Sequence, residues 1–275
     1  MPFSTEVMLL AGAVLAAGLV SGFLAGFFGI GGGAIVVFAL YETFRFVGVP
    51  EAVRMHLCIG TALAVMVPTT LASFTSHRRR GSVDEALARR WVVPVVAGVA
   101  AGAAVAAFAN QALLKLVFAV LAAVNGVLML RGGLPWRLEQ EAPTTGAMAG
   151  SGFAIGLLST LMGIGGGVFG NMFLSLYGRP MHQVVGTSAS LGVIIGVAGS
   201  LGYMAAGFGR PDLPLGSIGY VSLLAVLIMA PIASLVAPLG VRAAHGLSAA
   251  RLKQAFGVFM LVLAARFWVS LVAGV

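Results

Sequence analysis

Two glycine-rich runs of the same five residues are the most distinctive feature of the sequence. GIGGG occurs at 29–33 and again at 163–167, each time after an apolar stretch. Glycine destabilises a helix interior by up to about 1 kcal/mol relative to alanine, so each run is predicted to break a helix. Such a break exposes backbone N–H groups and helix N-termini, which bind anions without a formal charge. Close packing of helices at glycine is the alternative explanation.

Polar side chains recur at matching places after the two runs. A Gly-Thr pair occurs in each half of the chain, and Asn171 follows the second run at a position where the first half has Val37. Hydroxyl and amide groups in an apolar helix can donate to an anion, or can bond a carbonyl or a neighbouring helix instead. The predicted substrate site comprises Gly31, Gly32, Gly33, Gly60, Thr61, Gly165, Gly166, Gly167, Asn171, Gly186, Thr187 and Ser188.

Four basic side chains lie near these groups and have two interpretations each. His56 and His182 occupy matching positions and are candidates for proton linkage, or are histidines at the membrane interface. Arg54 and Arg179 precede or begin the same helices and could attract an anion, or could extend to lipid headgroups.

Enzymatic and metal chemistry is poorly supported by the residue types. Ser188 or Ser190 with His182 on one helix gives poor nucleophile-to-base geometry, and there is no Gly-x-Ser-x-Gly elbow. The single cysteine, Cys58, excludes an internal disulfide and any metal motif with several cysteines. We therefore expect no catalytic residue, no metal and no cofactor.

The elements that position these residues are membrane helices. Of the 275 residues, 60% are hydrophobic and 9% are charged, and the mean hydropathy is +1.05. Soluble domains are about 25% charged, and a bilayer core needs about 20 apolar residues per helical span. The chain is predicted to be an all-α integral membrane protein. In such a chain the net charge of +8 is a signal for orientation in the bilayer, and it does not indicate a nucleic-acid partner.

The sequence is a duplication of one unit. Residues 18–33 align without gaps on 152–167, and the similarity resumes around the Gly-Thr pairs. This predicts a first repeat at 1–131, a cytoplasmic linker at 132–145 and a second repeat at 146–275. Each repeat has five hydrophobic segments, expected at 7–28, 34–46, 54–76, 91–109 and 112–130, and at 146–162, 168–177, 182–206, 216–239 and 250–272. The second segment of each repeat is too short to span a bilayer, which is typical of a broken or re-entrant helix.

Basic residues are distributed oppositely in the two repeats. Five arginines (Arg78, Arg79, Arg80, Arg89 and Arg90) follow the third segment of the first repeat, where the second repeat has Arg210 with Asp212. After the fourth segment, basic residues occur in the second repeat and not in the first. Because loops rich in Lys and Arg stay in the cytoplasm, the repeats are predicted to be inverted, with both termini outside. Lys115 is interpreted as a determinant of this topology, and Arg266 either pairs internally or faces the membrane surface.

Duplicated GIGGG runs, each followed by a short helix and then by Gly-Thr-Ser or Gly-Thr-Ala, resemble the TauE/SafE family of sulfite exporters. The resemblance covers nearly the whole chain and implies a bacterial inner-membrane transporter for sulfite, an organosulfonate such as sulfoacetate, or a related small anion. The first copy departs from the pattern at Ala62, which argues against equal roles for the two halves. The family signature falls on Gly29, Gly31, Gly32, Gly33, Gly60 and Thr61, and on Gly163, Gly165, Gly166, Gly167, Gly186, Thr187 and Ser188.

The predicted mechanism is alternating access around a midplane site formed by the two breaks. Export is favoured because a membrane potential that is negative inside drives an anion outward by about 2.3 kcal/mol per charge per 100 mV, without a coupled ion. An anion-selective channel is the alternative, since it would use the same donors in a continuous pore.

Overall fold

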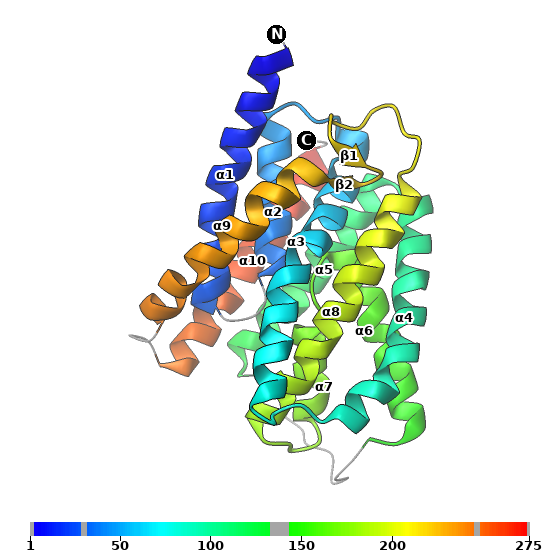
Figure 1. Cartoon of the computed structure of the whole chain (residues 1–275), viewed down its shortest axis with the longest axis vertical. Coiled ribbons are helices and arrows are strands. Elements are labelled where there is room, and N and C mark those ends of the chain that lie inside the picture. The colour runs from blue at the N-terminus through cyan, green and yellow to red at the C-terminus, as the bar shows by residue number, and fades with distance from the viewer. Residues whose placement is uncertain (1–2, 29–31, 133–142, 245–247, 274–275) are drawn as a thin grey trace.

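The structure is a computed structural model that describes residues 3–28, 32–132, 143–244 and 248–273. Over these residues the chain forms ten helices and one short β-hairpin (Figure 1). The first repeat contains α1 (Phe3–Phe28), α2 (Gly33–Phe46), α3 (Glu51–Arg79), α4 (Glu85–Phe108) and α5 (Gln111–Leu130). The second contains α6 (Thr145–Met162), α7 (Gly167–Ser175), α8 (Met181–Ala206), β1 (Ser217–Ile218), β2 (Val221–Ser222), α9 (Leu223–Ala244) and α10 (Ala249–Ala273).

Each predicted hydrophobic segment corresponds to one helix, but the prediction of a helix at 216–239 was wrong at its start. Residues 217–222 form the β-hairpin instead, and α9 begins at Leu223. Gly216 and Gly219 have φ of +76° and +51°, a conformation that glycine adopts without strain and that ends regular helix. A short apolar run between such glycines is ambiguous between strand and helix from its hydropathy alone.

Seven helices are long and apolar enough to cross a membrane, counted over the described residues. They are α3, α4, α5, α6, α8, α9 and α10, with α8 and α10 qualifying from His182 and Ala250. The chain is therefore a nearly all-helical integral membrane protein. The two short helices are mostly buried within the protein: Val37, Leu40 and Phe44 of α2 have no exposed surface, and Leu174 of α7 is 1% exposed.

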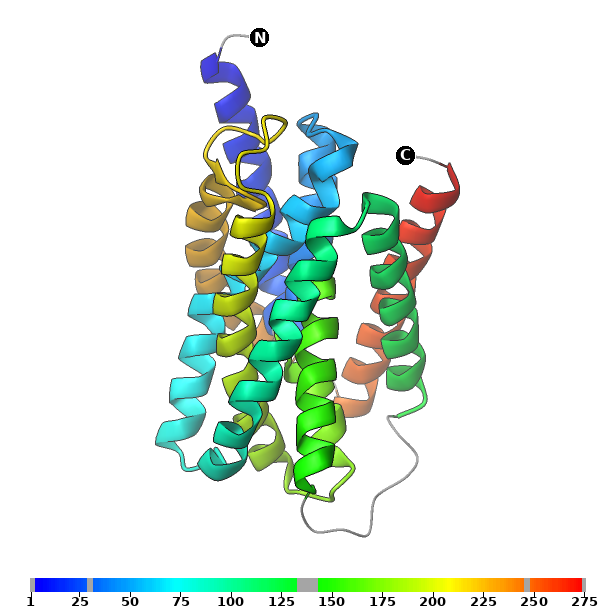
Figure 2. The same cartoon turned by 90° about the vertical axis from the view of Figure 1, so that its right-hand side faces the viewer.

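The helices cross the molecule in alternating directions. The start of α1 and the end of α10 lie at the same end of the bundle, at the top of Figures 1 and 2. Figure 2 shows α4 and α6 ascending from the lower end, whereas α5 descends. The central helices α3 and α8 pack against each other and run in opposite directions. We call the end with the termini the upper end and the opposite one the lower end.

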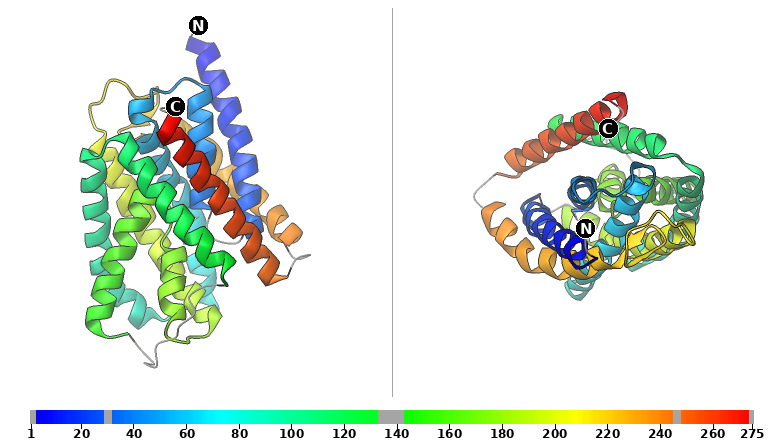
Figure 3. Two further views of the ribbon diagram at one scale, coloured as in Figure 1. Left: turned by 180° about the vertical axis from the view of Figure 1, so that it is seen from behind. Right: turned by 90° about the horizontal axis from the view of Figure 1, so that it is seen from above.

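The two repeats exchange packing partners. The first helix of each repeat packs along the fourth helix of the other, so α1 lies on α9 and α6 lies on α4. The last helices, α5 and α10, pack against each other and form one side of the molecule, as the view from behind and the view from above show (Figure 3). Each repeat therefore completes the core of the other.

Local sequence signals position the helices that carry the site. Pro50 and Pro180 precede α3 and α8, where a residue without an N–H group is tolerated because the first helical N–H groups have no partner in the helix. Asp84 caps α4 by accepting a hydrogen bond from Leu87 N at 3.0 Å. The Ser222 hydroxyl accepts from Ala225 N at 3.3 Å at the corresponding start of α9.

Candidate functional site

The second GIGGG run separates α6 from α7. Helix α6 ends at Met162, and Gly163 follows in the left-handed conformation with φ of +71°. Helix α7 begins at Gly167. In the first repeat, Gly32 has φ of +64° and α2 begins at Gly33, while Gly31 lies outside the described residues. Only glycine adopts this φ at no cost, which explains the residue type at Gly32 and Gly163.

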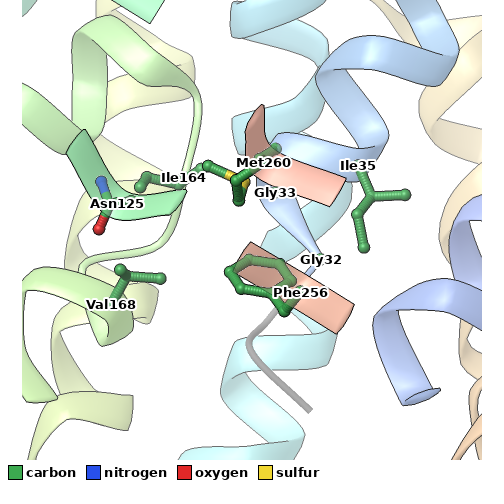
Figure 4. Close-up of a pocket in the computed structure, with 9 residues that line it drawn as sticks. Gly32, Gly33, Ile35, Asn125, Ile164, Val168, Phe256 and Met260 are labelled. Atoms are coloured by element: carbon green, nitrogen blue, oxygen red, sulfur yellow. The ribbon is translucent and has the colours of Figure 1, made fainter. Parts of the chain in front are cut away.

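The glycine runs of the two repeats touch. A Cβ atom on Gly33 would lie 2.7 Å from the carbonyl oxygen of Gly163 and 2.8 Å from Cα of Ile164, so any larger residue would separate the two segments. Figure 4 shows Gly33 and Ile164 with Asn125, Val168, Phe256 and Met260, which line a small pocket beside this contact. The space left among them is about 10 Å³, room for about one water molecule. The passage between the two runs is closed here.

A cavity of about 130 Å³ opens on the other side of the second run. It lies toward the lower end, between α3, the start of α7 and α8. We call it the lower cavity. Its lining is made of small, hydroxyl and amide residues, and none of the described residues that line it is charged: Thr69, Thr70, Ser73, Gly165, Gly167, Asn171, Val185, Ser188, Ala189 and Gly192.

Two polar atoms at the lower cavity are buried without a hydrogen-bond partner. They are Oγ of Ser188 and Oδ1 of Asn171. Leaving such an atom unpaired costs about 1 to 3 kcal/mol, which a bound ligand can recover. The Asn171 amide can also turn its N–H₂ group toward the same place by rotation. By contrast, the hydroxyls of Thr69 and Thr70 both donate to the carbonyl oxygen of Met66, at 2.8 and 2.9 Å.

Glycine shapes the lower cavity. A Cβ atom on Gly167 would meet nothing within 4 Å, so this residue leaves the cavity open. A Cβ atom on Gly170 would lie 2.8 Å from Ser188 Oγ, and Gly170 therefore makes room for that hydroxyl. Gly165 also lines the cavity, but Gly166 does not: its Cβ would point into the packing, 2.6 Å from Ile195 Cδ1.

The predicted Gly-Thr pairs do not line the lower cavity. They make the same type of contact in both repeats. Thr61 Oγ1 accepts a hydrogen bond from Ser222 N, and Thr187 Oγ1 accepts one from Asp84 N, both at 3.0 Å. Each threonine thus holds the start of the fourth helix of the other repeat. Both side chains are buried, at 0% and 1% exposure.

The glycines of these pairs allow the same contacts. A Cβ atom on Gly60 would lie 2.2 Å from the carbonyl oxygen of Tyr220, and one on Gly186 would lie 2.5 Å from that of Ser82. We call each Gly-Thr pair with its bound segment a clamp: the upper clamp joins Gly60-Thr61 to 220–222, and the lower clamp joins Gly186-Thr187 to 82–84. Of the predicted hydroxyls, only Ser188 lines the lower cavity.

The two predicted arginines are engaged within the protein. Arg54 is buried, donates from Nε and Nη2 to the carbonyl oxygen of Val49 at 3.1 and 2.8 Å, and lies over the ring of Tyr41. Arg179 pairs with Asp84 at 2.6 Å, beside the lower clamp. Partial burial opposes ionisation of Asp84, but hydrogen bonds from Leu87 N and from Arg179 hold the pKa of its carboxyl below the usual value.

The two matched histidines have different surroundings. His56 is buried near the upper end, where Nε2 lies 3.1 Å from the carbonyl oxygens of both Ala106 and Ala109. Its ring stacks on Tyr220 with the centroids 4.7 Å apart. His182 is exposed at the start of α8 near the lower end. The structure therefore brings neither histidine to the lower cavity.

Two further charged residues form ion pairs within the protein. Arg266 pairs with Glu42 at 2.9 Å, so of its two interpretations the structure supports internal pairing. Lys115, interpreted as a topology determinant, is 2% exposed and pairs with Glu51 at 2.6 Å. Its burial could not be read from the sequence, because it occurs one turn inside a helix where a lysine can also extend to the interface. Thr69 and Ser73 are four residues apart and lie on one helical face, so their spacing could have predicted part of the cavity lining.

The fold and the cavity are those of a helical membrane protein with a small uncharged cavity between its helices, an architecture that membrane transporters share. The family model described as sulfite exporter TauE/SafE matches residues 14–267, and the chain belongs to this family. No group of three or more histidine, cysteine or acidic residues that could hold a metal ion occurs in the described part of the chain.

Relatives of this chain carry the same kind of name. A "Probable membrane transporter protein" of Haemophilus influenzae is 30% identical over 250 residues, which cover 91% of this chain and 95% of that protein. Another of Methanocaldococcus jannaschii is 27% identical over 226 residues, covering 82% and 83%. A third, of Bacillus subtilis, is 27% identical over 220 residues, covering 75% and 80%. No solved structure matches the chain.

Proposed function

We propose that this protein exports a small anion, sulfite or an organosulfonate such as sulfoacetate, across a bacterial inner membrane, and that the lower cavity binds it. The observation that carries the proposal is the pair of buried polar atoms without a hydrogen-bond partner, Ser188 Oγ and Asn171 Oδ1, at the second GIGGG run. Ser188 can donate to an anion directly, and Asn171 donates when its amide turns the N–H₂ group to this place. Hydroxyl and amide dipoles replace the hydration of an anion without placing a charge in the bilayer, where charged side chains are costly. Family membership supports the substrate class.

The proposed site contains fewer of the predicted residues than the sequence alone indicated. Of the twelve residues first considered, Gly165, Gly167, Asn171 and Ser188 line the lower cavity. Thr69, Thr70 and Ser73 of α3 join them. Gly32 and Gly33 form the closed contact next to the cavity, and the Gly-Thr pairs form the clamps. The anion therefore meets one face of the second glycine run, and the first run closes the path beyond it.

Alternating access between inverted repeats is the mechanism that this arrangement supports. Corresponding helices such as α1 and α6 run in opposite directions, and the repeats exchange their first and fourth helices. The two clamps tie the start of each fourth helix to the other repeat, so a movement of one repeat is transmitted to the helix that covers the other. Closure at Gly33 and Gly163 favours a carrier over a channel, because a channel holds a continuous pore.

We infer the orientation of the protein in the membrane from its basic residues and the direction of transport from the charge of the anion. The lower end carries the Arg78, Arg79 and Arg80 run and Arg131, so we assign it to the cytoplasm and the termini to the outside. The lower cavity then faces the cytoplasm and loads the anion there. Exit is driven by the membrane potential, at about 2.3 kcal/mol per charge per 100 mV.

The test is flux of labelled sulfite, sulfoacetate and sulfate from proteoliposomes that contain the purified protein. Gly167→Val places a branched side chain in the open space of the cavity and is expected to abolish flux. Ser188→Ala removes one hydrogen bond to the anion, worth about 1.5 to 3 kcal/mol, and is expected to lower kcat/KM at least about tenfold.

Matched controls are available on neighbouring helices. Gly150→Val introduces the same side chain in α6 where it meets nothing within 4 Å, and Ser76→Ala removes an exposed hydroxyl of α3. Both should transport normally. If none of the three anions moves, the proposed function is wrong. If wild type is active and both cavity variants transport like it, the proposed site is wrong.

A further inference from the structure

A second, larger cleft lies at the upper end, between the starts of α3 and α5 and the end of α10. Its volume is about 570 Å³. We call it the upper cleft. Its lining includes charged and amide side chains: Glu51, His56, Asn110, Gln111, Lys115 and Arg210, with Tyr220 and Ser270 beside them. The proposed transport function does not account for these residues.

A buried ammonium group is the main feature of the upper cleft. Lys115 is 2% exposed, and its Nζ donates to Glu51 Oε1 at 2.6 Å and to Ser270 Oγ at 2.9 Å. The same nitrogen lies 5.4 Å from the ring centroid of Tyr41. Burying a charge in a membrane protein is costly, and such residues commonly face a functional cavity. The surroundings of Lys115 hold its ammonium group in place at the wall of the cleft.

The amide of Gln111 is the second feature. Its Oε1 accepts a hydrogen bond from Met55 N at 3.1 Å, which fixes the orientation of the amide. Nε2 is then left buried without a hydrogen-bond partner, in a side chain that is 8% exposed. Gln111 is also the first residue of α5, where the helix N-terminus favours negative charge. An oxyanion supplies the acceptor that this N–H₂ group lacks.

Glu51 shows where such an anion would lie. Its carboxylate binds Lys115 and lines the same cleft as the Gln111 amide. The Glu51 side chain is 46% exposed, so it can leave the cleft for water at little cost. Arg210 is paired with Asp212 at 2.8 Å. His56 Nδ1 is buried without a partner, but it is a hydrogen-bond acceptor when Nε2 carries the proton and so does not bind an anion.

We propose that the upper cleft is a second binding site for a small oxyanion, in which Lys115 and Gln111 hold the anion in the place of the Glu51 carboxylate. The proposal rests on the proposed function, since it gives the exported anion an exit site at the outer face. Glu51 competes with the anion for Lys115. Its return displaces the bound anion and leaves the cleft without a permanent ligand.

The test measures binding with the lower cavity blocked. Isothermal titration calorimetry of sulfite, sulfoacetate and chloride with full-length Gly167→Val protein in detergent reports the upper cleft alone. Added to that background, Lys115→Met is expected to weaken sulfite binding at least about tenfold, because it removes the cation. Gln111→Leu is expected to weaken it several-fold. Glu51→Gln is expected to tighten it several-fold, because the internal competitor is lost. Chloride should bind more weakly than either oxyanion.

The controls separate a folding defect from a binding defect. Arg45→Gln removes an exposed upper-end charge that does not line the cleft and should leave the dissociation constant unchanged. Lys115→Met can fail to fold, and then Gln111→Leu and Glu51→Gln decide the outcome. Unchanged affinity in both, or weaker binding with Glu51→Gln, would overturn the proposal. These results are independent of proteoliposome flux, so transport without upper-cleft binding refutes this site and leaves the proposed function intact.

Discussion

The lower cavity and the upper cleft lie toward opposite ends of α3 and use different chemistry. The lower cavity is small and is lined by hydroxyl, amide and glycine residues, whereas the upper cleft is about four times larger and includes Glu51, Lys115 and Arg210. In the lower cavity, two polar atoms have no partner. In the upper cleft, the Lys115 ammonium group is already paired with the Glu51 carboxylate.

This difference follows from the cost of charge in a membrane. An unpaired ammonium group inside the helix bundle would be expensive, and it would also bind an anion too tightly to release it. Neutral dipoles avoid both effects beside the glycine break. Near the upper end, Lys115 is tolerated because Glu51, which is half exposed to solvent, compensates its charge. A transporter can therefore use neutral groups where the path is closed and charged groups where it opens.

After the blocking substitution Gly167→Val, the largest expected effect is that of a negative charge in the lower cavity. Asn171→Asp changes the size of the side chain very little but adds a carboxylate where no cation lines the described part of the cavity. Because two like charges in a site of low dielectric repel strongly, we expect anion flux to fall by at least about a hundredfold. The measurement is sulfite flux in proteoliposomes. Gln254→Glu, the same change at an exposed position of α10, is the control and should transport normally. Normal flux by Asn171→Asp would place the anion elsewhere.

A smaller effect is expected from breaking the clamps. Thr61→Val leaves the buried N–H of Ser222 without its acceptor, and Thr187→Val does the same to the partly buried N–H of Asp84, each at a cost of about 1 to 3 kcal/mol in the free energy of unfolding. The unfolding temperature of the detergent-solubilised protein measures this. Thr75→Val, on the exposed part of α3, is the control. Because the two clamps share no partner, their effects should add. A double variant no less stable than either single variant would contradict that independence.

The smallest effect concerns Asp84 at the lower clamp. Its pKa is lowered in the folded protein, so its ionised form stabilises the fold above the unfolded pKa of about 3.9, and this contribution is lost as the pH falls through the lower folded value. Asp84→Asn keeps the helix cap but loses the pair with Arg179. We expect it to be less stable than wild type by under about 1 kcal/mol at pH 7. The difference in unfolding temperature should vanish once the pH is below the folded-state pKa of Asp84. A difference that persists there would assign the effect to geometry and not to charge.

Much of the fold could be predicted from the sequence. Apolar stretches separated by proline, glycine and charge marked the helices, with bounds that shifted by a few residues at their ends. The hairpin at 217–222 could not be predicted, because its short apolar run is stabilised as strand by the turn at Gly219. The site was predicted in part. Glycine and hydroxyl residues were found at matched positions, but spacing along a helix does not show which neighbour each residue meets.

The sequence by itself determined that the chain needs a bilayer, and it predicted a duplication and a helix break at each GIGGG run. Hydropathy requires a bilayer, and the second GIGGG run follows the end of α6. Only the tertiary structure decided that Thr61 and Thr187 bind backbone N–H groups of the other repeat while Ser188 next to them faces a cavity. It also decided that Lys115 is buried beside Glu51. The physical reason is that a polar group acts on whatever lies within hydrogen-bonding distance, and in this fold that partner comes from a distant part of the chain.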